Sequence, residues 1–290
     1  MILITGATGT TGREVVAELQ RLGATGVRAL VRDPARASFI REAGFETVGG
    51  DFDRPETLDA ALEGVETALL LTPPSPHTYA YQRDFIESAK RAGLRRVVKV
   101  SAIGADAAAP EGFGRWHGQA EEFLKASGLA WTILRPNFFM QNLLGQAHTV
   151  ATQGAIYQPG GDARASLIDA RDIAAVAARS LTDEGHEGKT YTLTGPEALS
   201  YADAAAKISE ATGRPVRYVA LTPEQFREGA LAQGLPEWLV SALERLNEFF
   251  ASGDAAQVTH DVRNVGGREP KTFEEFARDH AAAFKAEARP

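Results

Sequence analysis

The sequence Thr5-Gly6-Ala7-Thr8-Gly9-Thr10-Thr11-Gly12 decides the fold, because it joins a short apolar run to an amphipathic stretch. Residues 1–4 predict a buried strand, and residues 13–19 begin a helix. Of the three glycines, the first permits a tight turn, the second a close approach to a pyrophosphate, and the third close packing of helix on strand. The N-terminus of a helix also attracts negative charge. We therefore predict a dinucleotide site formed by Gly6, Thr8, Gly9, Thr10, Thr11 and Gly12, against the alternative of a glycine-rich turn without a ligand.

Strands and helices alternate along the first two thirds of the chain. After the first strand, further strands are predicted at residues 26–32, 46–52, 67–72, 96–101, 130–135, 167–169 and 189–194. Helices of ordinary length are predicted between most of them, including 81–92, 114–126 and one that begins at residue 170. This alternation predicts an α/β fold with a Rossmann-like, doubly wound parallel sheet.

The last third of the chain has a different pattern. Beyond Gly195 it is mainly helical, with helices predicted at residues 200–212, 222–232, 237–251 and 272–285. We expect a dinucleotide-binding domain over residues 1–155, completed by residues 164–195. Residues 196–290, with about 140–163, form a smaller, mainly helical lobe that encloses the substrate.

Composition excludes several classes of protein. The 290 residues carry a net charge of −7, which argues against nucleic acid or an anionic membrane as the main partner. The chain has no cysteine, so disulfides, thiolate catalysis and Cys-ligated zinc are excluded. No apolar run approaches the ~20 residues of a membrane span. Because the first strand starts at residue 2, we expect no signal peptide and a cytoplasmic protein. A homodimer is a candidate assembly.

Arg32 occupies the position that distinguishes the two nicotinamide cofactors. It ends the second predicted strand, 20 positions after Gly12, where a carboxylate would hold the ribose 2′-hydroxyl of NAD. A guanidinium there pairs with a 2′-phosphate instead. The sequence thus favours NADP(H), although Asp33 next to it weakens the argument and a solvated arginine is the plain alternative.

Other candidate residues follow the ends of predicted strands. Asp51 could accept the adenine amino group or merely form a turn, and Ser101 leaves the fifth strand where a nicotinamide ring is expected. Ser101 could bond to substrate or cofactor, or simply end its strand. Aromatic side chains that could line a pocket for a flat acceptor, although most aromatics are core, are Tyr79, Tyr81, Phe113, Trp116, Phe138 and Phe139.

Several motifs together resemble one family. They are TGATGTTG at 5–12, LVRDP at 30–34, GDFD at 50–53, VSAIGAD at 100–106, TILRPNFFMQN at 132–142 and DARDIA at 169–174. The chain resembles the NmrA-like branch of the atypical short-chain dehydrogenase/reductase superfamily. Within that branch it is most similar to the NADPH-dependent quinone reductases of the second type and to the triphenylmethane dye reductases.

The resemblance implies specific cofactor contacts. It implies that residues 6–12 bind the pyrophosphate and that Arg32 takes the 2′-phosphate. It implies adenine contacts from Asp51 and Phe52, ribose contacts from Leu71, Thr72 and Pro73, and nicotinamide contacts from Ser101 and Ala102. The segment Pro136, Asn137, Phe138 and Phe139 would border the nicotinamide carboxamide and the substrate pocket.

The catalytic pair of most short-chain dehydrogenases, Tyr-x-x-x-Lys, is missing. None of the six tyrosines is followed by lysine four positions later, so alcohol dehydrogenation by that mechanism is not expected. An electron-poor acceptor can instead take hydride directly from nicotinamide. We predict His117 as its proton donor, since an imidazole titrates near neutrality, with Glu121 one turn later to orient it. The alternative is that His117 only fixes the ribose or a loop.

The sequence therefore predicts an NADPH-dependent oxidoreductase that transfers hydride to a quinone or similar conjugated, electron-poor acceptor. Ser101 and His117 are its candidate catalytic residues, and its candidate pocket residues are Tyr79, Phe113, Trp116, His117, Phe138 and Phe139. One alternative is a non-catalytic NADP(H)-binding redox sensor that acts through a protein partner. Another is a reductase or isomerase of a specialised metabolite. The remaining histidines are scattered without metal-ligand spacing, so no metal site is expected.

Overall fold

The computed structural model describes residues 1–285, and the chain divides into two units. The first comprises Met1–Arg135, Ala170–Thr192 and Asp261–Gly267, and the second comprises Pro136–Asp169, Leu193–His260 and Arg268 onward. The division differs from the expected one in three places. The first segment of the first unit ends at Arg135 rather than at residue 155, the second is Ala170–Thr192 rather than 164–195, and Asp261–Gly267 also belongs to that unit. Residues 286–290 of the predicted lobe lie outside the described residues.

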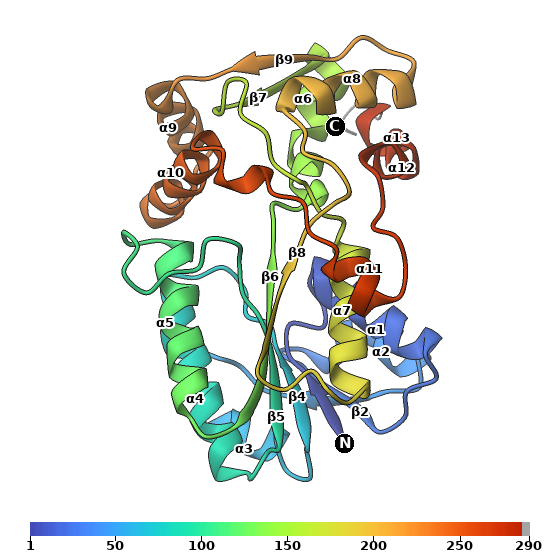
Figure 1. Ribbon diagram of the computed structural model, residues 1–290, viewed down its shortest axis with the longest axis vertical. Coiled ribbons are helices and arrows are strands. Elements are labelled where there is room, and N and C mark those ends of the chain that lie inside the picture. The colour runs from blue at the N-terminus through green and yellow to red at the C-terminus, as the bar shows by residue number, and fades with distance from the viewer. Residues whose placement is uncertain (286–290) are drawn as a thin grey trace. The chain divides into compact units, whose positions relative to one another are not determined.

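A seven-stranded sheet forms the centre of the first unit (Figure 1). Its order is β3-β2-β1-β4-β5-β6-β8. The strands are β1 (Ile2–Ile4), β2 (Val27–Val31), β3 (Glu46–Gly49), β4 (Thr67–Leu70), β5 (Arg96–Val100), β6 (Ala130–Pro136) and β8 (Lys189–Leu193).

The strands of this sheet run parallel. Ile4 of β1 pairs with Ala29 of β2 on one side and with Leu69 of β4 on the other, both in parallel register. β8 follows the same direction, because the Gly188 N–H binds the Trp131 carbonyl and the Asn137 N–H binds the Leu193 carbonyl. The predicted α/β, Rossmann-like, doubly wound sheet is confirmed.

Helices cover both faces of the sheet. α1 and α11 both pack on α7 along one face, and α3, α4 and α5 cover the other (Figure 1). Leu3, Leu70, Phe85, Val97 and Leu124 belong to the buried core under the second group. The bounds are α1 Thr10–Arg21, η1 Pro34–Arg36, α2 Ser38–Glu42, α3 Glu56–Ala61, α4 Thr78–Arg91, α5 Phe113–Ala126, α7 Ala170–Thr182 and α11 Asp261–Gly266.

The second unit contains most of the predicted C-terminal helices and one sheet that the sequence did not reveal. Its helical segments are η2 Met140–Gln146, α6 Ala147–Gln153, α8 Tyr201–Thr212, α9 Pro223–Ala232, α10 Glu237–Ala251, η3 Asp254–Ala256, α12 Phe273–Asp279 and α13 Ala281–Lys285. The missed sheet pairs β7 (Ala155–Gln158) in parallel with β9 (Arg217–Ala220). Strands of four residues are too short to show a convincing alternation of apolar and polar residues.

Two further expectations about elements are corrected. The predicted strand 167–169 is a single bridge between Ile168 and Phe139. The helix predicted at 272–285 is interrupted at His280, which ends α12 before α13 begins. α8, α9 and α12 each begin with a capping box, which explains why their starts could be predicted from sequence.

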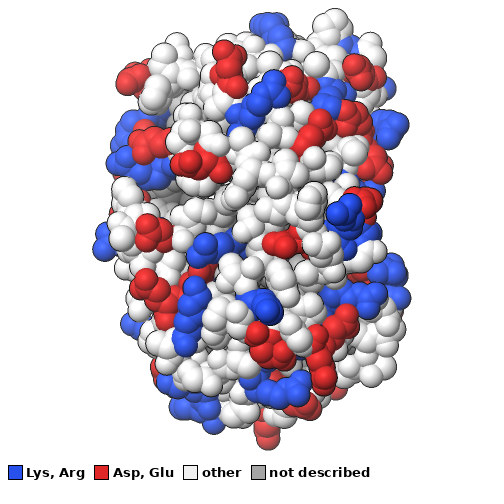
Figure 2. All heavy atoms as spheres, in the orientation of Figure 1, with Lys and Arg blue, Asp and Glu red and all other residues white. Residues whose placement is uncertain are grey.

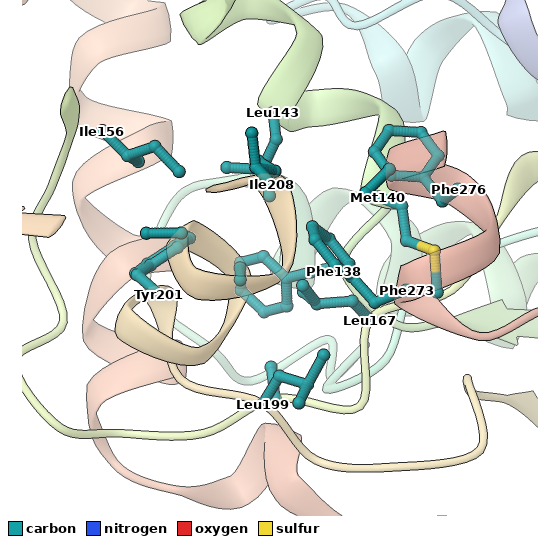
Figure 3. Close-up of a cluster of buried hydrophobic side chains, with 14 of the residues drawn as sticks. Phe138, Met140, Leu143, Ile156, Leu167, Leu199, Tyr201, Ile208, Phe273 and Phe276 are labelled. Atoms are coloured by element: carbon teal, nitrogen blue, oxygen red, sulfur yellow. The ribbon is translucent and has the colours of Figure 1, made fainter. Parts of the chain in front are cut away.

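The core of the second unit is aromatic and aliphatic. Figure 3 shows Phe138 among Met140, Leu167 and Phe273, and its ring meets that of Phe250 edge-on at 5.2 Å between centroids. Offset and edge-on ring contacts add to the free energy gained by burying the rings.

The surface carries charges of both signs. Figure 2 shows acidic and basic side chains intermingled over the face in view. Within residues 1–285, we find no helix with the length and apolar character that crossing a membrane requires.

Candidate cofactor and active site

The glycine-rich turn lies where the strand order of the sheet reverses. β1 has β2 on one side and β4 on the other, and ligands of open α/β sheets bind outside the carboxyl ends of strands at such a point. Gly6 has φ of +64°, and a Cβ there would lie 2.7 Å from the Leu71 carbonyl oxygen. A Cβ on Gly12 would lie 2.1 Å from the Gly6 carbonyl oxygen. Both positions therefore require glycine, and they bring Leu71 against the turn.

The outer side of the same turn is open. Thr8, Gly9 and Thr10 are exposed, and a Cβ on Gly9 would meet one atom only, at 3.4 Å. Gly9 caps α1 without a side-chain hydrogen bond, and the first turn of that helix has no acidic residue. The helix N-terminus thus keeps its N–H groups and positive field for an anion, which fits a pyrophosphate.

Arg32 at the end of β2 is exposed, and within residues 1–285 it has no hydrogen bond or ion pair. The neighbouring Asp33 accepts a hydrogen bond from the Ala35 N–H at 3.0 Å and caps η1. The Asp33 carboxylate, which spoke against NADP as a neighbour of Arg32, is thus bound within its own turn. This arrangement leaves the Arg32 guanidinium available for a phosphate.

The other predicted cofactor residues of the first unit lie at the same edge of the sheet. They differ in how much of each side chain is already hydrogen-bonded or buried. Asp51 follows β3 and accepts a hydrogen bond from the Asp53 N–H at 3.2 Å. The Phe52 ring is buried and stacks on Tyr81 at 5.7 Å, so only the main chain of Phe52 remains for a ligand. Thr72 accepts a hydrogen bond from Gln82 at 2.9 Å, and Pro73 beside it is exposed.

A charged cluster lies at the carboxyl end of β5. We call Lys99, Ser101, His117, Glu121 and Arg135 the β5–α5 cluster. Ser101 donates a hydrogen bond to Glu121 at 2.6 Å, and Arg135 holds the same carboxylate with two hydrogen bonds of 2.6 and 3.0 Å. Lys99 Nζ lies 3.1 Å from His117 Nδ1. The cluster therefore has two parts, a carboxylate bound by three donors and a lysine–histidine pair.

Burial and charge displace the pKa values of this cluster. Burial lowers the pKa of Lys99 to about 7, against the raising effect of Glu121 and with Arg135 and Lys125 lowering it further. Burial, followed by the charge of Lys99, holds the pKa of His117 well below its usual value. Burial acts to raise the pKa of Glu121, but hydrogen bonds from Arg135 and Ser101 outweigh it and leave that pKa low. Such displaced values mark candidate functional sites.

The structure corrects the partner predicted for His117 and shows where the Ser101 hydroxyl proton points. Glu121 is bound by Ser101 and Arg135, and within the described chain it makes no hydrogen bond to His117, which Lys99 contacts instead. Because the pKa of His117 is low, its imidazole is neutral at pH 7 and cannot act as a free imidazolium acid. The Ser101 hydroxyl proton is directed to Glu121, so toward a ligand this oxygen can only accept.

The predicted pocket residues are not all available to a ligand. Trp116 is buried and donates its indole N–H to Glu111, while Phe113 meets it edge-on and is half-buried. Tyr79 is half-buried on α4. A Cβ on Gly118 would lie 2.3 Å from the Ala107 N, so the loop after β5 packs directly against α5 beside His117.

The segment that follows β6 belongs to the second unit. The Asn137 side chain is 2 % exposed and donates to the Ser166 hydroxyl at 2.7 Å and to the Ala255 carbonyl at 2.8 Å. Its Oδ1 accepts the Phe138 N–H. The side chains of Asn137 and Phe138 are thus buried inside the second unit, whereas Phe139 is half-buried. That Pro136, Asn137, Phe138 and Phe139 border a nicotinamide stays a prediction.

Comparison with known proteins identifies the family. A family model described as NAD(P)H-binding matches residues 6–184. The chain belongs to this family of NAD(P)H-binding proteins. It is 45% identical over 286 residues to an NAD(P)H azoreductase from Xenophilus azovorans, covering 99% of this chain and 100% of that protein. It is 34% identical over 245 residues to quinone oxidoreductase 2 from Escherichia coli, covering 84% of this chain and 85% of that protein.

A solved structure agrees with these relatives. The NADPH-dependent quinone oxidoreductase from Escherichia coli, crystallised with NADPH, has a TM-score of 0.88 and 30% identity to this chain. The match covers 96% of this chain and 99% of that one. The predicted resemblance and the predicted oxidoreductase class are confirmed, and this protein is an NAD(P)H-dependent oxidoreductase.

Sequence reasoning missed Lys99 and Arg135 as members of the cluster. A signal for Lys99 was present, because a lysine in the otherwise apolar run 97–100 contradicts the continuous apolar character of a central parallel strand. No such signal marked Arg135, which lies near the end of β6 as an ordinary arginine before a proline.

Proposed function

We propose that this protein is an NADPH-dependent reductase that transfers hydride to a quinone or a similar conjugated, electron-poor acceptor. The observation that supports this most is that the β5–α5 cluster offers a neutral imidazole in a chain that lacks the tyrosine–lysine pair of most short-chain dehydrogenases. A ketone needs a strong, positioned acid to accept hydride, whereas an electron-poor acceptor needs only a weak proton source once it has been reduced. The site suits the second kind of acceptor.

The names of the relatives support this class of substrate. They include an NAD(P)H azoreductase and a quinone oxidoreductase. Azo groups and quinones are both conjugated, take up two electrons, and form anions that must then be protonated. We therefore propose quinones and azo compounds as the first substrates to test.

The cofactor is proposed to be NADP(H). The N–H groups at the start of α1 would hold its pyrophosphate, and Arg32 its 2′-phosphate. Asp51 and the Phe52 main chain would border its adenine, and Leu71, Thr72 and Pro73 its ribose. When bound, NADPH supplies two electrons and one proton as hydride.

The chain's own residues would do the rest. Ser101 and Ala102 are proposed to border the nicotinamide, and the Ser101 oxygen can accept a hydrogen bond there. His117, neutral and with its proton on Nε2, is proposed to donate that proton to the reduced acceptor. Tyr79, Phe113 and Phe139, each half-buried, are proposed to contact the flat face of the acceptor.

Cofactor consumption with a panel of acceptors tests the activity. We expect saturable oxidation of NADPH with quinones and azo dyes, with one quinol formed per NADPH and two NADPH consumed per azo bond cleaved to amines. Tight binding of NADPH without turnover of any acceptor would overturn the proposal in favour of a redox sensor. Sedimentation of the same preparation tests the predicted homodimer.

Arg32→Ser tests the choice of cofactor. We expect the Kd for NADPH to rise about tenfold, which is about 1.4 kcal/mol, because one charge-assisted contact to the 2′-phosphate is lost. The Kd for NADH should not change, since NADH lacks that phosphate. Arg91→Ser is the matched control, because Arg91 is an exposed arginine on α4 that pairs with Asp59. Equal effects on both cofactors would contradict the assignment of Arg32.

A further inference from the structure

Lys99 is buried where a charge is costly. Its side chain is 0% exposed, and its strand neighbours across the sheet are Leu70 of β4 and Ile133 of β6. A buried ammonium must be paired and hydrogen-bonded, or it loses its proton. The groups that face Lys99 are therefore decisive for what it does.

The carboxylate that could neutralise Lys99 is held by other groups. Glu121 on α5 receives Ser101 from the end of β5 and Arg135 from β6, and Lys125 on α5 lies 3.6 Å from it. Within residues 1–285 the one hydrogen-bond partner of Lys99 is Nδ1 of His117, at 3.1 Å. Arg135 and Lys125 repel the Lys99 charge and Glu121 attracts it, so its proton is only weakly held at neutral pH.

This contact determines which nitrogen of His117 carries the proton. An ammonium has only protons to donate, so Nδ1 must accept and the imidazole proton must be on Nε2. A neutral Lys99 amine can instead accept a hydrogen bond from an Nδ1–H group. The protonation state of Lys99 and the tautomer of His117 are thus coupled by one hydrogen bond.

We propose that Lys99 is the internal proton donor that gives His117 a new proton as His117 protonates the reduced acceptor. This inference rests on the proposed function. The Nε2–H bond of His117 breaks and an O–H or N–H bond forms on the reduced acceptor. At the same time an N–H bond of the Lys99 ammonium breaks and a bond from that proton to Nδ1 forms. The imidazole stays neutral throughout, Lys99 becomes a neutral amine, and it regains its proton from water through His117 after product leaves.

Nitrogen-15 NMR of the imidazole rings, without cofactor or acceptor, tests the coupling. In the wild type we expect His117 as the Nε2–H tautomer at about pH 6 and a change of tautomer as Lys99 titrates near pH 7. Lys99→Met should abolish that change. Lys90→Met is the control, because Lys90 is a half-exposed lysine that pairs with Glu87 on α4. A pH response of His117 that is the same in wild type and Lys99→Met would overturn the proposal.

Two acceptors distinguish failure of this inference from failure of the proposed function. A quinone needs hydride and a proton, whereas a triphenylmethane dye is a carbocation that hydride alone converts to product. We expect Lys99→Met to lower the ratio of quinone to dye turnover by about a hundredfold, the lower end of general acid catalysis. An unchanged ratio would overturn the relay. Failure of the wild type to reduce either acceptor would overturn the proposed function, while the NMR titration still decides the Lys99–His117 coupling.

Discussion

The strand β5 carries a fully buried cation near each end, and the two have opposite surroundings. Near the amino end, Arg96 is 2% exposed and donates at 3.0 Å to the carbonyls of Leu181 and Asp183 and to the Glu187 carboxylate. Near the carboxyl end, the hydrogen bond that Lys99 makes within the described residues is to one imidazole nitrogen of His117. Arg96 thus stabilises the connection between α7 and β8, whereas Lys99 gains little from its position. In a doubly wound sheet only the carboxyl end faces the ligand, which is where a poorly paired charge indicates function rather than packing.

Arg96→Met should have the largest effect on stability. It removes the donors for two carbonyls and a carboxylate, so we expect a loss of about 3–5 kcal/mol in the free energy of unfolding. Because a guanidinium stays charged throughout, the loss should be the same at about pH 6 and pH 9. Urea unfolding at both pH values measures it. A loss of unfolding free energy below about 1 kcal/mol would mean that Arg96, at the amino end of β5, does not stabilise the fold as its contacts indicate.

Lys99→Met should change stability in the opposite direction and with pH. The pKa of Lys99 is lower in the folded protein than in the unfolded chain, so the unfolded chain binds more protons between pH 7 and the usual lysine pKa. The cost of burying Lys99 is therefore largest below pH 7 and falls as pH rises. We expect the advantage of Lys99→Met in urea unfolding to be about 2–3 kcal/mol larger at pH 6 than at pH 9. A pH-independent difference would mean that Lys99 is as well paired as Arg96.

Ser101→Ala should have the smallest effect. It removes one hydrogen bond to a charged carboxylate that Arg135 still holds, so we expect a loss of about 1.5 kcal/mol near neutral pH. This bond helps to keep the pKa of Glu121 low, so the stability it adds is present above the usual carboxyl pKa and disappears as pH falls through the folded value. Thermal unfolding across the acid range would show the difference from wild type closing. A difference that persists in acid would contradict this assignment.

The fold could be predicted from sequence because its signals are local. The turn at residues 5–12 needs glycine where a Cβ would strike backbone, and apolar strands such as 67–70 and 96–100 follow one another at regular spacing. The elements that sequence did not predict are short or depend on contacts between distant parts of the chain. Strands 155–158 and 217–220 pair across more than fifty residues, and Asp261–Gly267 rejoins the first unit through contacts of α11 with α7 that no local pattern indicates.

The candidate site was predicted in part, and for a physical reason. Spacing from the glycine turn predicted Arg32 as a phosphate ligand, and it is exposed and makes no hydrogen bond or ion pair within residues 1–285. Helix periodicity placed His117 and Glu121 on one face. Sequence could not say which partner each would choose. Glu121 bonds to Ser101 and Arg135 because β5 and β6 bring these side chains to it. Lys99 therefore contacts His117 rather than Glu121. Competition among partners from different strands is a tertiary property.

The most direct test of the central claim is a single turnover of the enzyme saturated with NADPH and mixed rapidly with a quinone. We predict loss of the near-ultraviolet absorbance of NADPH with one reduced quinone formed per cofactor, and a slower loss when NADPH is deuterated at its hydride position. Such a result would establish direct hydride transfer to a conjugated acceptor. NADPH that stays reduced in the presence of quinone and azo acceptors would contradict the account and leave a cofactor-binding protein without this chemistry.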